Sequence, residues 1–301
     1  MFQQVDTRVP HEVEREVSAI YHQMFADAQP GFVSTAFDWV GECFVGQFDG
    51  FQAIDARYHD LEHTLQGTLC FARLLHGRHE ARVEPVLIRK MFELGLLAIL
   101  FHDTGYLKKR EDNGGTGAKY TLVHVARSAA FASDYLGRKG FPETDILAIQ
   151  NMIRCTGVNV DLAAIPFHSE LERIVGYALS TSDLLGQMAA RDYIDKLPIL
   201  YQEFAEAARY SGDRSSRASM FSSAEDLMRK TPGFWEKYVW PRINGEFRGL
   251  YKFLAHPYPE GTNHYLDRVR ENLRRLEGMT VSAGPTLTSP ADGREGVGRG
   301  N

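Results

Sequence analysis

The feature that most constrains the fold is the placement of histidines and aspartates at the ends or on the inward faces of apolar helical segments. The clearest case is His102-Asp103, which directly follows the apolar run 94–101 and precedes Thr104-Gly105, where a helix is expected to end. An unpaired buried charge is costly, and a carboxylate at a helix C-terminus also faces the negative end of the macrodipole. A divalent cation removes both penalties, and His and Asp are ligands that hydrolytic metal sites use.

Apolar residues recur at helical spacing through most of the chain, and alternating strand patterns are nearly absent. This pattern predicts an all-α fold, a single helical bundle. Ser169 and Glu172 have the spacing of a capping box and mark one helix start. The expected helices are 10–28, 33–46, 58–75, 84–103, 119–137, 143–155, 170–190, 192–209, 224–253 and 262–278.

The predicted organisation has three parts. An N-terminal helix within 1–32 packs on the core, and 33–278 form one helical catalytic domain. The segment 279–301 is rich in Gly, Pro, Ser and Thr without apolar periodicity, which predicts a disordered tail. The Ser- and Arg-rich stretch 211–223 is expected to be a mobile loop.

Bulk properties narrow the class of protein. A net charge of −5 gives no general attraction to nucleic acid. The cysteines Cys43, Cys70 and Cys155 are odd in number and widely spaced, which argues against a disulfide framework. No signal peptide or membrane-spanning run is recognisable. We expect a cytoplasmic protein without a nucleic-acid or membrane partner; the aromatic segment 234–240 leaves open whether a homodimer forms.

Four further residues are candidates for the same site. His59 and His63 are four residues apart, which would place both on one face of a helix. Asp183 lies on or beside the inward stripe of its helix, and His124 falls within an amphipathic segment. Asp192 is a rival carboxylate, as is Asp195, but both are expected to face solvent.

The order His63, His102-Asp103, Asp183 resembles the H…HD…D pattern of the HD-domain superfamily of metal-dependent phosphohydrolases, over roughly residues 35–210. Tyr58-His59 followed by His63 is similar to the YHxxxH motif that opens the cyclic-nucleotide phosphodiesterases. The resemblance implies an HD-type helical bundle.

It also implies residue roles. The four residues His63, His102, Asp103 and Asp183 would hold one divalent ion, Asp103 would be shared with a second ion near His124, and His59 would protonate the leaving oxygen. In the phosphodiesterases a Glu stands three residues before the second-metal His, where this chain has Thr121.

The predicted function is therefore metal-dependent hydrolysis of a phosphoester, with a phosphodiesterase acting on a nucleotide-like small molecule as the preferred form. The ligand set fits Mn, Mg, Fe, Zn or Co and does not choose among them. One alternative is an HD-fold diiron oxygenase, which needs two well-placed histidines where this chain offers His124 and the loop residue His168. Another is a nucleotide-sensing module without catalysis.

Substrate contacts are predicted close to the metal motif. Lys108, Lys109 and Arg110 follow it and could bind phosphate, although a solvated basic turn is equally compatible with the sequence. The glycine-rich stretch 111–117 would form a flexible lip near the site. Gln187, one turn after Asp183, could orient a substrate base or a water.

Overall fold

The computed structural model describes residues 4–211 and 220–282, and within them the chain is all-α, as predicted. No strand occurs in these ranges; the extended pairing there consists of isolated bridges, Phe51 with Lys109 and His256 with Thr262. The expected tail beyond 282 and most of the expected loop 211–223 lie outside the described residues. The helices are α1 (Pro10–Met24), α2 (Phe32–Phe44), α3 (Leu61–Glu80), α4 (Arg89–Phe101), α5 (His124–Arg138), α6 (Glu143–Arg154), α7 (Glu170–Met188), α8 (Tyr193–Ser211), α9 (Ala224–Phe234) and α10 (His264–Ser282).

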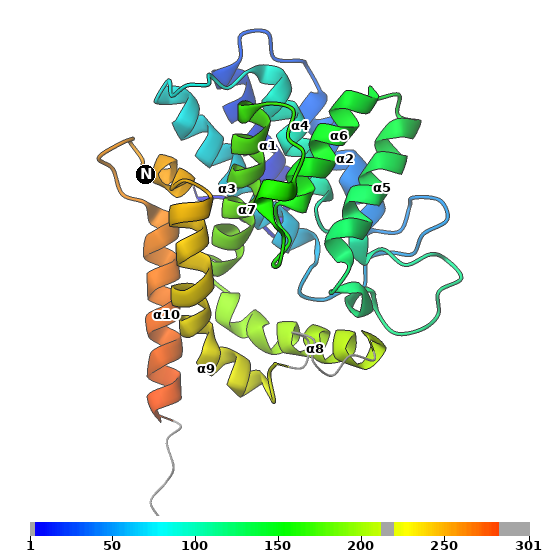
Figure 1. Cartoon of the computed structure of the whole chain (residues 1–301), viewed down its shortest axis with the longest axis vertical. Coiled ribbons are helices and arrows are strands. Elements are labelled where there is room, and N and C mark those ends of the chain that lie inside the picture. The colour runs from blue at the N-terminus through cyan, green and yellow to red at the C-terminus, as the bar shows by residue number, and fades with distance from the viewer. Residues whose placement is uncertain (1–3, 212–219, 283–301) are drawn as a thin grey trace, which may run out of the picture.

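The helices α3, α4 and α7 form the centre of the bundle, and most of their residues are buried. Helix α1 covers α3 with an apolar face, α5 and α6 pack together on another side, and α9 and α10 run alongside each other at the edge (Figure 1). Helix α8 runs across one end of the bundle. The elements that carry the predicted ligands therefore meet at the end of the bundle that α8 crosses.

The close approach of α3 and α7 depends on a glycine. A Cβ atom on Gly186 would lie 2.7 Å from the carbonyl oxygen of Gln66, so a larger residue would push the two helices apart. His63 and Asp183 are one turn before Gln66 and Gly186 on the respective helices. The glycine therefore brings an imidazole and a carboxylate from distant parts of the chain next to each other.

Several helix boundaries differ from the predicted ones. The predicted helix 58–75 begins only at Leu61, because Asp60 is its N-cap and accepts a hydrogen bond from the His63 backbone N–H. The predicted helix 84–103 begins at Arg89, after the segment that contains Pro85. The predicted helix 119–137 begins at His124, after a short 3₁₀ turn.

The C-terminal boundaries also need correction. The predicted helix 224–253 is divided into α9, two π-helical turns (Trp235–Val239 and Arg242–Glu246) and a 3₁₀ turn. Pro241, between the π turns, has no N–H to donate, so it cannot continue the α-helical hydrogen bonds. Helix α10 continues to Ser282, past the predicted end at 278.

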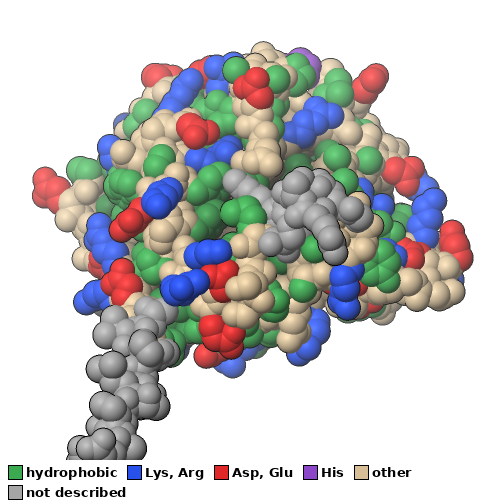
Figure 2. All heavy atoms as spheres, turned by 60° about the horizontal axis from the view of Figure 1, so that its bottom comes forward, with side chains coloured by type: hydrophobic (Ala, Val, Ile, Leu, Met, Phe, Trp, Pro, Cys, Tyr) green, Lys and Arg blue, Asp and Glu red, His purple; other side chains and the backbone are tan. Residues whose placement is uncertain are grey.

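The charges on the surface and the state of the cysteines can be compared with what the composition indicated. On the face shown in Figure 2, acidic and basic side chains are interspersed without a large area of one sign. Cys43, Cys70 and Cys155 are buried free thiols. None of the helices that the structure describes is both long and apolar enough to cross a membrane.

Candidate metal centre

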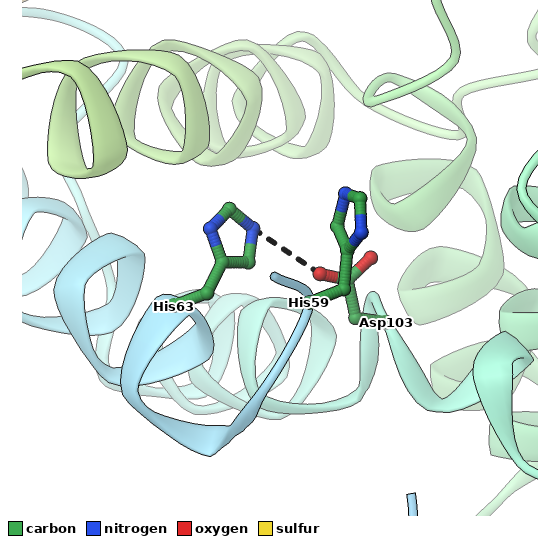
Figure 3. A group of neighbouring side chains, drawn as sticks. All are labelled: His59, His63 and Asp103. Atoms are coloured by element: carbon green, nitrogen blue, oxygen red, sulfur yellow. Dashed lines mark ion pairs between the residues drawn. The ribbon is translucent and has the colours of Figure 1, made fainter. Parts of the chain in front are cut away.

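Two imidazoles and two carboxylates from three parts of the chain meet at one buried point. His63 comes from the first turn of α3, His102 and Asp103 directly follow α4, and Asp183 comes from α7. We call these four residues the His–Asp tetrad. The Nε2 atom of His63 lies 3.2 Å from Asp103 Oδ2 (Figure 3) and 3.3 Å from Asp183 Oδ1. The Nε2 atom of His102 lies 3.3 Å and 3.4 Å from the same two oxygens.

These four atoms alternate nitrogen and oxygen around a closed ring, and the spacing suits a cation at its centre. Ligands about 2.1 Å from a metal ion are about 3.0 Å apart at a right angle and about 3.4 Å apart at a tetrahedral angle. The observed separations of 3.2 to 3.4 Å fall between these values. The adjacent separations in the tetrad are therefore compatible with one divalent ion.

The orientation of the imidazoles supports the same conclusion. His102 Nδ1 lies 2.7 Å from the Ile99 carbonyl oxygen, and His124 Nδ1 lies 2.6 Å from the Thr121 carbonyl oxygen. When Nδ1–H donates to a carbonyl, Nε2 is left with its lone pair, and metal-bound histidines are typically held in this way. The Nε2 atoms of both residues face Asp103.

Two tetrad atoms are buried without a hydrogen-bond partner, namely His102 Nε2 and Asp103 Oδ2. Buried polar atoms are normally paired, so each such exception needs an explanation. Both atoms belong to the ring of four ligand atoms. A metal ion at its centre would pair both of them.

The electrostatics of the tetrad favour charged imidazoles beside ionised carboxylates. Burial disfavours the charged form of His63, but the adjacent carboxylates of Asp103 and Asp183 outweigh it and raise the pKa of His63 to about 10. The pKa of His102 is also raised, because the charges of the same carboxylates outweigh its burial. Burial likewise opposes ionisation of Asp103, yet the charge of His102 and the adjacent imidazole of His63 hold its pKa well below the usual range.

The outer oxygen of Asp103 faces a third imidazole, that of His124. Asp103 Oδ1 lies 3.8 Å from His124 Nε2, whereas Oδ2 belongs to the tetrad. Burial lowers the pKa of His124 despite the charge of Asp103, so this imidazole is available as a neutral ligand. The two oxygens of Asp103 thus face different groups, as in a carboxylate that bridges two ions.

The backbone around His124 is fixed by close contacts. A Cβ atom on Gly105 would lie 2.0 Å from the His124 carbonyl oxygen, so only glycine permits this approach. Arg127, one turn further along α5, donates to the carbonyl oxygens of Gly105 and Leu107 at 2.7 Å and 2.6 Å. These contacts hold the segment after the His-Asp pair against the start of α5.

His59 does not share a helical face with His63, contrary to the prediction, because it precedes the N-cap of α3. The chain nevertheless brings the two rings to a centroid distance of 5.3 Å, and both lie beside Asp103 (Figure 3). His59 Nδ1 lies 2.6 Å from Glu203 Oε2 on α8, and the other oxygen of Glu203 accepts a hydrogen bond from the Tyr58 backbone N–H at 2.7 Å. His59 is therefore held by a buried carboxylate.

Sequence reasoning missed Glu203 and Tyr106. Glu203 stands three residues after Leu200 and four before Ala207, and a carboxylate on this stripe was a usable signal. Tyr106 follows the His-Asp pair by three residues. Its ring packs nearly parallel to His59 and to His124, at centroid distances of 4.5 Å and 4.9 Å.

The predicted substrate-binding residues have different surroundings. Lys108 is buried and its Nζ atom lies 2.8 Å from Asp55 and 2.8 Å from the Gly115 carbonyl oxygen, so it has a structural role. Lys109 and Arg110 are exposed. No contact found among the described residues joins these three cations to the tetrad.

Gln187 does lie at the tetrad. Its Nε2 atom donates to Asp183 Oδ1 at 3.3 Å and to the Asp183 carbonyl oxygen at 3.0 Å. Its Oε1 atom accepts a hydrogen bond of 2.7 Å from the Tyr58 hydroxyl. Gln187 therefore orients a tetrad carboxylate, in addition to any role in substrate binding.

The remaining candidates lie apart from the centre. The His168 side chain is 57% exposed and lies 3.4 Å from Glu172, as expected for a loop residue. Asp195 is exposed, and Asp192 lies 3.7 Å from Lys196. The glycine-rich stretch 111–117 is joined to α8, where Glu206 accepts hydrogen bonds from the backbone and the hydroxyl of Thr116.

Comparison with known proteins places the chain in a family. Residues 7–254 match the Npun_R2479-like family, and because this match spans most of the chain, the chain belongs to that family. The matched range contains every residue of the centre described above. No curated protein sequence matches the chain.

Proposed function

We propose that this member of the Npun_R2479-like family is a metal-dependent phosphohydrolase, with a phosphodiesterase acting on a nucleotide-like phosphoester as its preferred form. The observation that carries the proposal is the His–Asp tetrad, whose four ligand atoms alternate around one point at 3.2 to 3.4 Å. The HD-type order of the ligands in the sequence supports the same assignment.

The tetrad would hold the first ion, and Asp103 Oδ1 with His124 Nε2 would contribute to a second. A bound divalent ion supplies Lewis-acid activation of a water nucleophile and neutralises charge on the phosphoryl oxygens. The ligand types admit Mn, Mg, Fe, Zn and Co. The role of the protein is to present two carboxylates and three imidazoles in fixed orientations.

His59 is the proposed general acid. Its Nδ1 atom is held by Glu203, so the Nε2 atom is the one that delivers a proton to the departing oxygen. The buried carboxylate stabilises the doubly protonated imidazolium that this step consumes, and it fixes the ring orientation. Because His59 lies beside Asp103, a substrate bound to the ion would have its leaving oxygen within reach of the acid.

The diiron oxygenase alternative receives less support from the geometry. That chemistry would use a second histidine between the His-Asp pair and Asp183, and His168 is the residue the sequence offers besides His124. Its side chain is 57% exposed and pairs with Glu172. The sensor alternative uses the same centre, but a sensor would bind its ligand without hydrolysing it.

The test is hydrolysis of bis-p-nitrophenyl phosphate and of cyclic nucleotides with added Mn²⁺, measured together with bound metal. We expect the wild-type protein to turn over, Asp103→Ala to lose both metal and turnover, and His59→Ala to keep metal but lose turnover. His168→Ala is the matched control, because it removes an exposed imidazole away from the centre.

Metal binding without turnover of any phosphoester would favour the sensor. Oxygen consumption by the iron-loaded protein would favour the oxygenase. Loss of metal in His59→Ala would overturn the division of roles between His59 and the tetrad.

A further inference from the structure

Tyr106 is a buried residue beside the candidate metal centre, and the proposed mechanism assigns it no role. It is 0% exposed, and its hydroxyl has no hydrogen-bond partner among the residues that the structure describes. Its ring lies against His59 and His124, with interplanar angles of 18° and 19°. Tyr106 therefore touches both the proposed acid and the proposed second-metal ligand.

The Tyr106 hydroxyl is one of several buried polar atoms of the centre that have no hydrogen-bond partner among the described residues. His102 Nε2 and Asp103 Oδ2 also lack hydrogen bonds, and a metal ion would pair them. A phenol is a poor ligand for such an ion while it keeps its proton, but it is a good hydrogen-bond donor. The oxygens of a substrate bound to the ion are the acceptors that would pair it.

The donor is an ordinary phenol. A phenol keeps its proton at neutral pH, so the Tyr106 hydroxyl has an O–H to donate. The hydroxyl of Thr121 donates to the Ala118 carbonyl oxygen at 2.6 Å.

The local backbone fixes where the ring stands. The Tyr106 backbone N–H donates to the Asp103 carbonyl oxygen at 3.1 Å, in the 3₁₀ turn that follows the His-Asp pair. Gly117 packs on the other side, where a Cβ atom would lie 2.2 Å from the Tyr106 carbonyl oxygen. The ring position is therefore set by the same turn that sets Asp103.

We propose that the Tyr106 hydroxyl donates a hydrogen bond to a phosphoryl oxygen of the substrate bound at the metal centre, which makes Tyr106 a further catalytic residue. This inference rests on the proposed phosphohydrolase function. Preorganised donors to a developing oxyanion typically contribute about 10²- to 10³-fold to kcat.

The test compares Tyr106→Phe, which removes a single oxygen, with Thr121→Val, which removes the hydroxyl beside it. Binding of orthovanadate to the Mn²⁺-loaded protein is measured by calorimetry, together with kcat and KM for bis-p-nitrophenyl phosphate and the Tm of the metal-free protein. We expect Tyr106→Phe to weaken vanadate binding about 10- to 100-fold, as for loss of a hydrogen bond to a charged group. We expect it to lower kcat by more than it raises KM and to retain metal, whereas Thr121→Val stays near the wild type.

The metal-free Tm is the independent readout. A hydroxyl without a partner contributes nothing to folding, so Tyr106→Phe should leave the Tm unchanged or raise it. A lower Tm, equal effects of the two substitutions, or unchanged vanadate binding would each overturn the proposal. A wild-type protein that binds vanadate through Tyr106 but hydrolyses no phosphoester would support the donor and refute the phosphohydrolase function.

Discussion

Metal binding to the His–Asp tetrad is predicted to release protons. In the metal-free protein His63 and His102 are stabilised in the charged form by Asp103 and Asp183, and the pKa of His63 rises to about 10. An imidazole binds a metal ion only when the coordinating nitrogen is deprotonated, so the ion must displace these protons. Since protons and metal compete, affinity for the metal rises as the pH rises.

The number of protons follows from the individual groups. Asp103 and Asp183 are ionised already, because their pKa values are lowered, and His124 is neutral because its pKa is lowered too. Only His63 and His102 have protons to lose. Near pH 6 both are charged, so about two protons are released and the Kd should fall about 100-fold per pH unit. As the pH rises through the pKa of His102, the number falls toward one, and the slope falls toward about tenfold per unit.

Calorimetry with Mn²⁺ in buffers of different ionisation enthalpy measures this number directly. The titration is run at pH 6 and at pH 8, beside His168→Asn, which removes an exposed imidazole away from the tetrad and should leave the result unchanged. Release of fewer than one proton at pH 6 would refute the reasoning. It would mean that the two imidazoles are neutral without metal, or that the ion binds elsewhere.

Three further predictions concern the supporting contacts. Glu203→Gln removes the charge that stabilises the His59 imidazolium, so kcat should fall at least about tenfold with bound metal unchanged. Gln187→Leu removes the donor to Asp183 and should weaken metal binding about 10- to 100-fold, read by calorimetry. Gly105→Ala places a Cβ atom 2.0 Å from a backbone oxygen and should destabilise the protein by at least about 1–3 kcal/mol, read by urea unfolding.

Each of these has a contrary result. Metal loss in Glu203→Gln would show that Glu203 supports the ligands rather than the acid. Unchanged affinity in Gln187→Leu would leave Asp183 oriented by the backbone alone. For the glycine, the matched control is Gly41→Ala inside α2, where a Cβ atom meets nothing and the change should stabilise by up to about 1 kcal/mol; equal behaviour of the two variants would contradict the close contact at Gly105.

The helical content, and the place of Asp103 and Asp183 on their helices, followed from local patterns, whereas the grouping of the four tetrad residues into one site followed from the resemblance to the HD-domain pattern. The inward stripe of α7 is a four-residue repeat, and Asp183 could be placed on it by counting from Val175. The His-Asp pair could be placed at a helix end because Gly105 follows it. Predictions of this kind need only the spacing of residues along one element.

What could not be predicted depends on contacts between distant segments or on competing local preferences. Asp60 is a favourable N-cap, so α3 begins at Leu61, two residues after His59. Only the packing of α8 brings Glu203 to His59, across 144 positions of the chain. Lys108 looked like a phosphate ligand, but Asp55 and the folded glycine-rich loop bind its ammonium group.

The metal ligands and the carboxylate that holds the proposed acid come from different parts of the bundle. The tetrad and His124 are supplied by α3, α5, α7 and the end of α4, whereas the carboxylate that holds His59 comes from α8, which crosses the end of the bundle (Figure 1). If the proposed function holds, affinity for the ion and proton delivery by His59 could therefore be altered independently. Sequence changes along α8 would then adjust the acid to a different leaving group without changing the metal ligands.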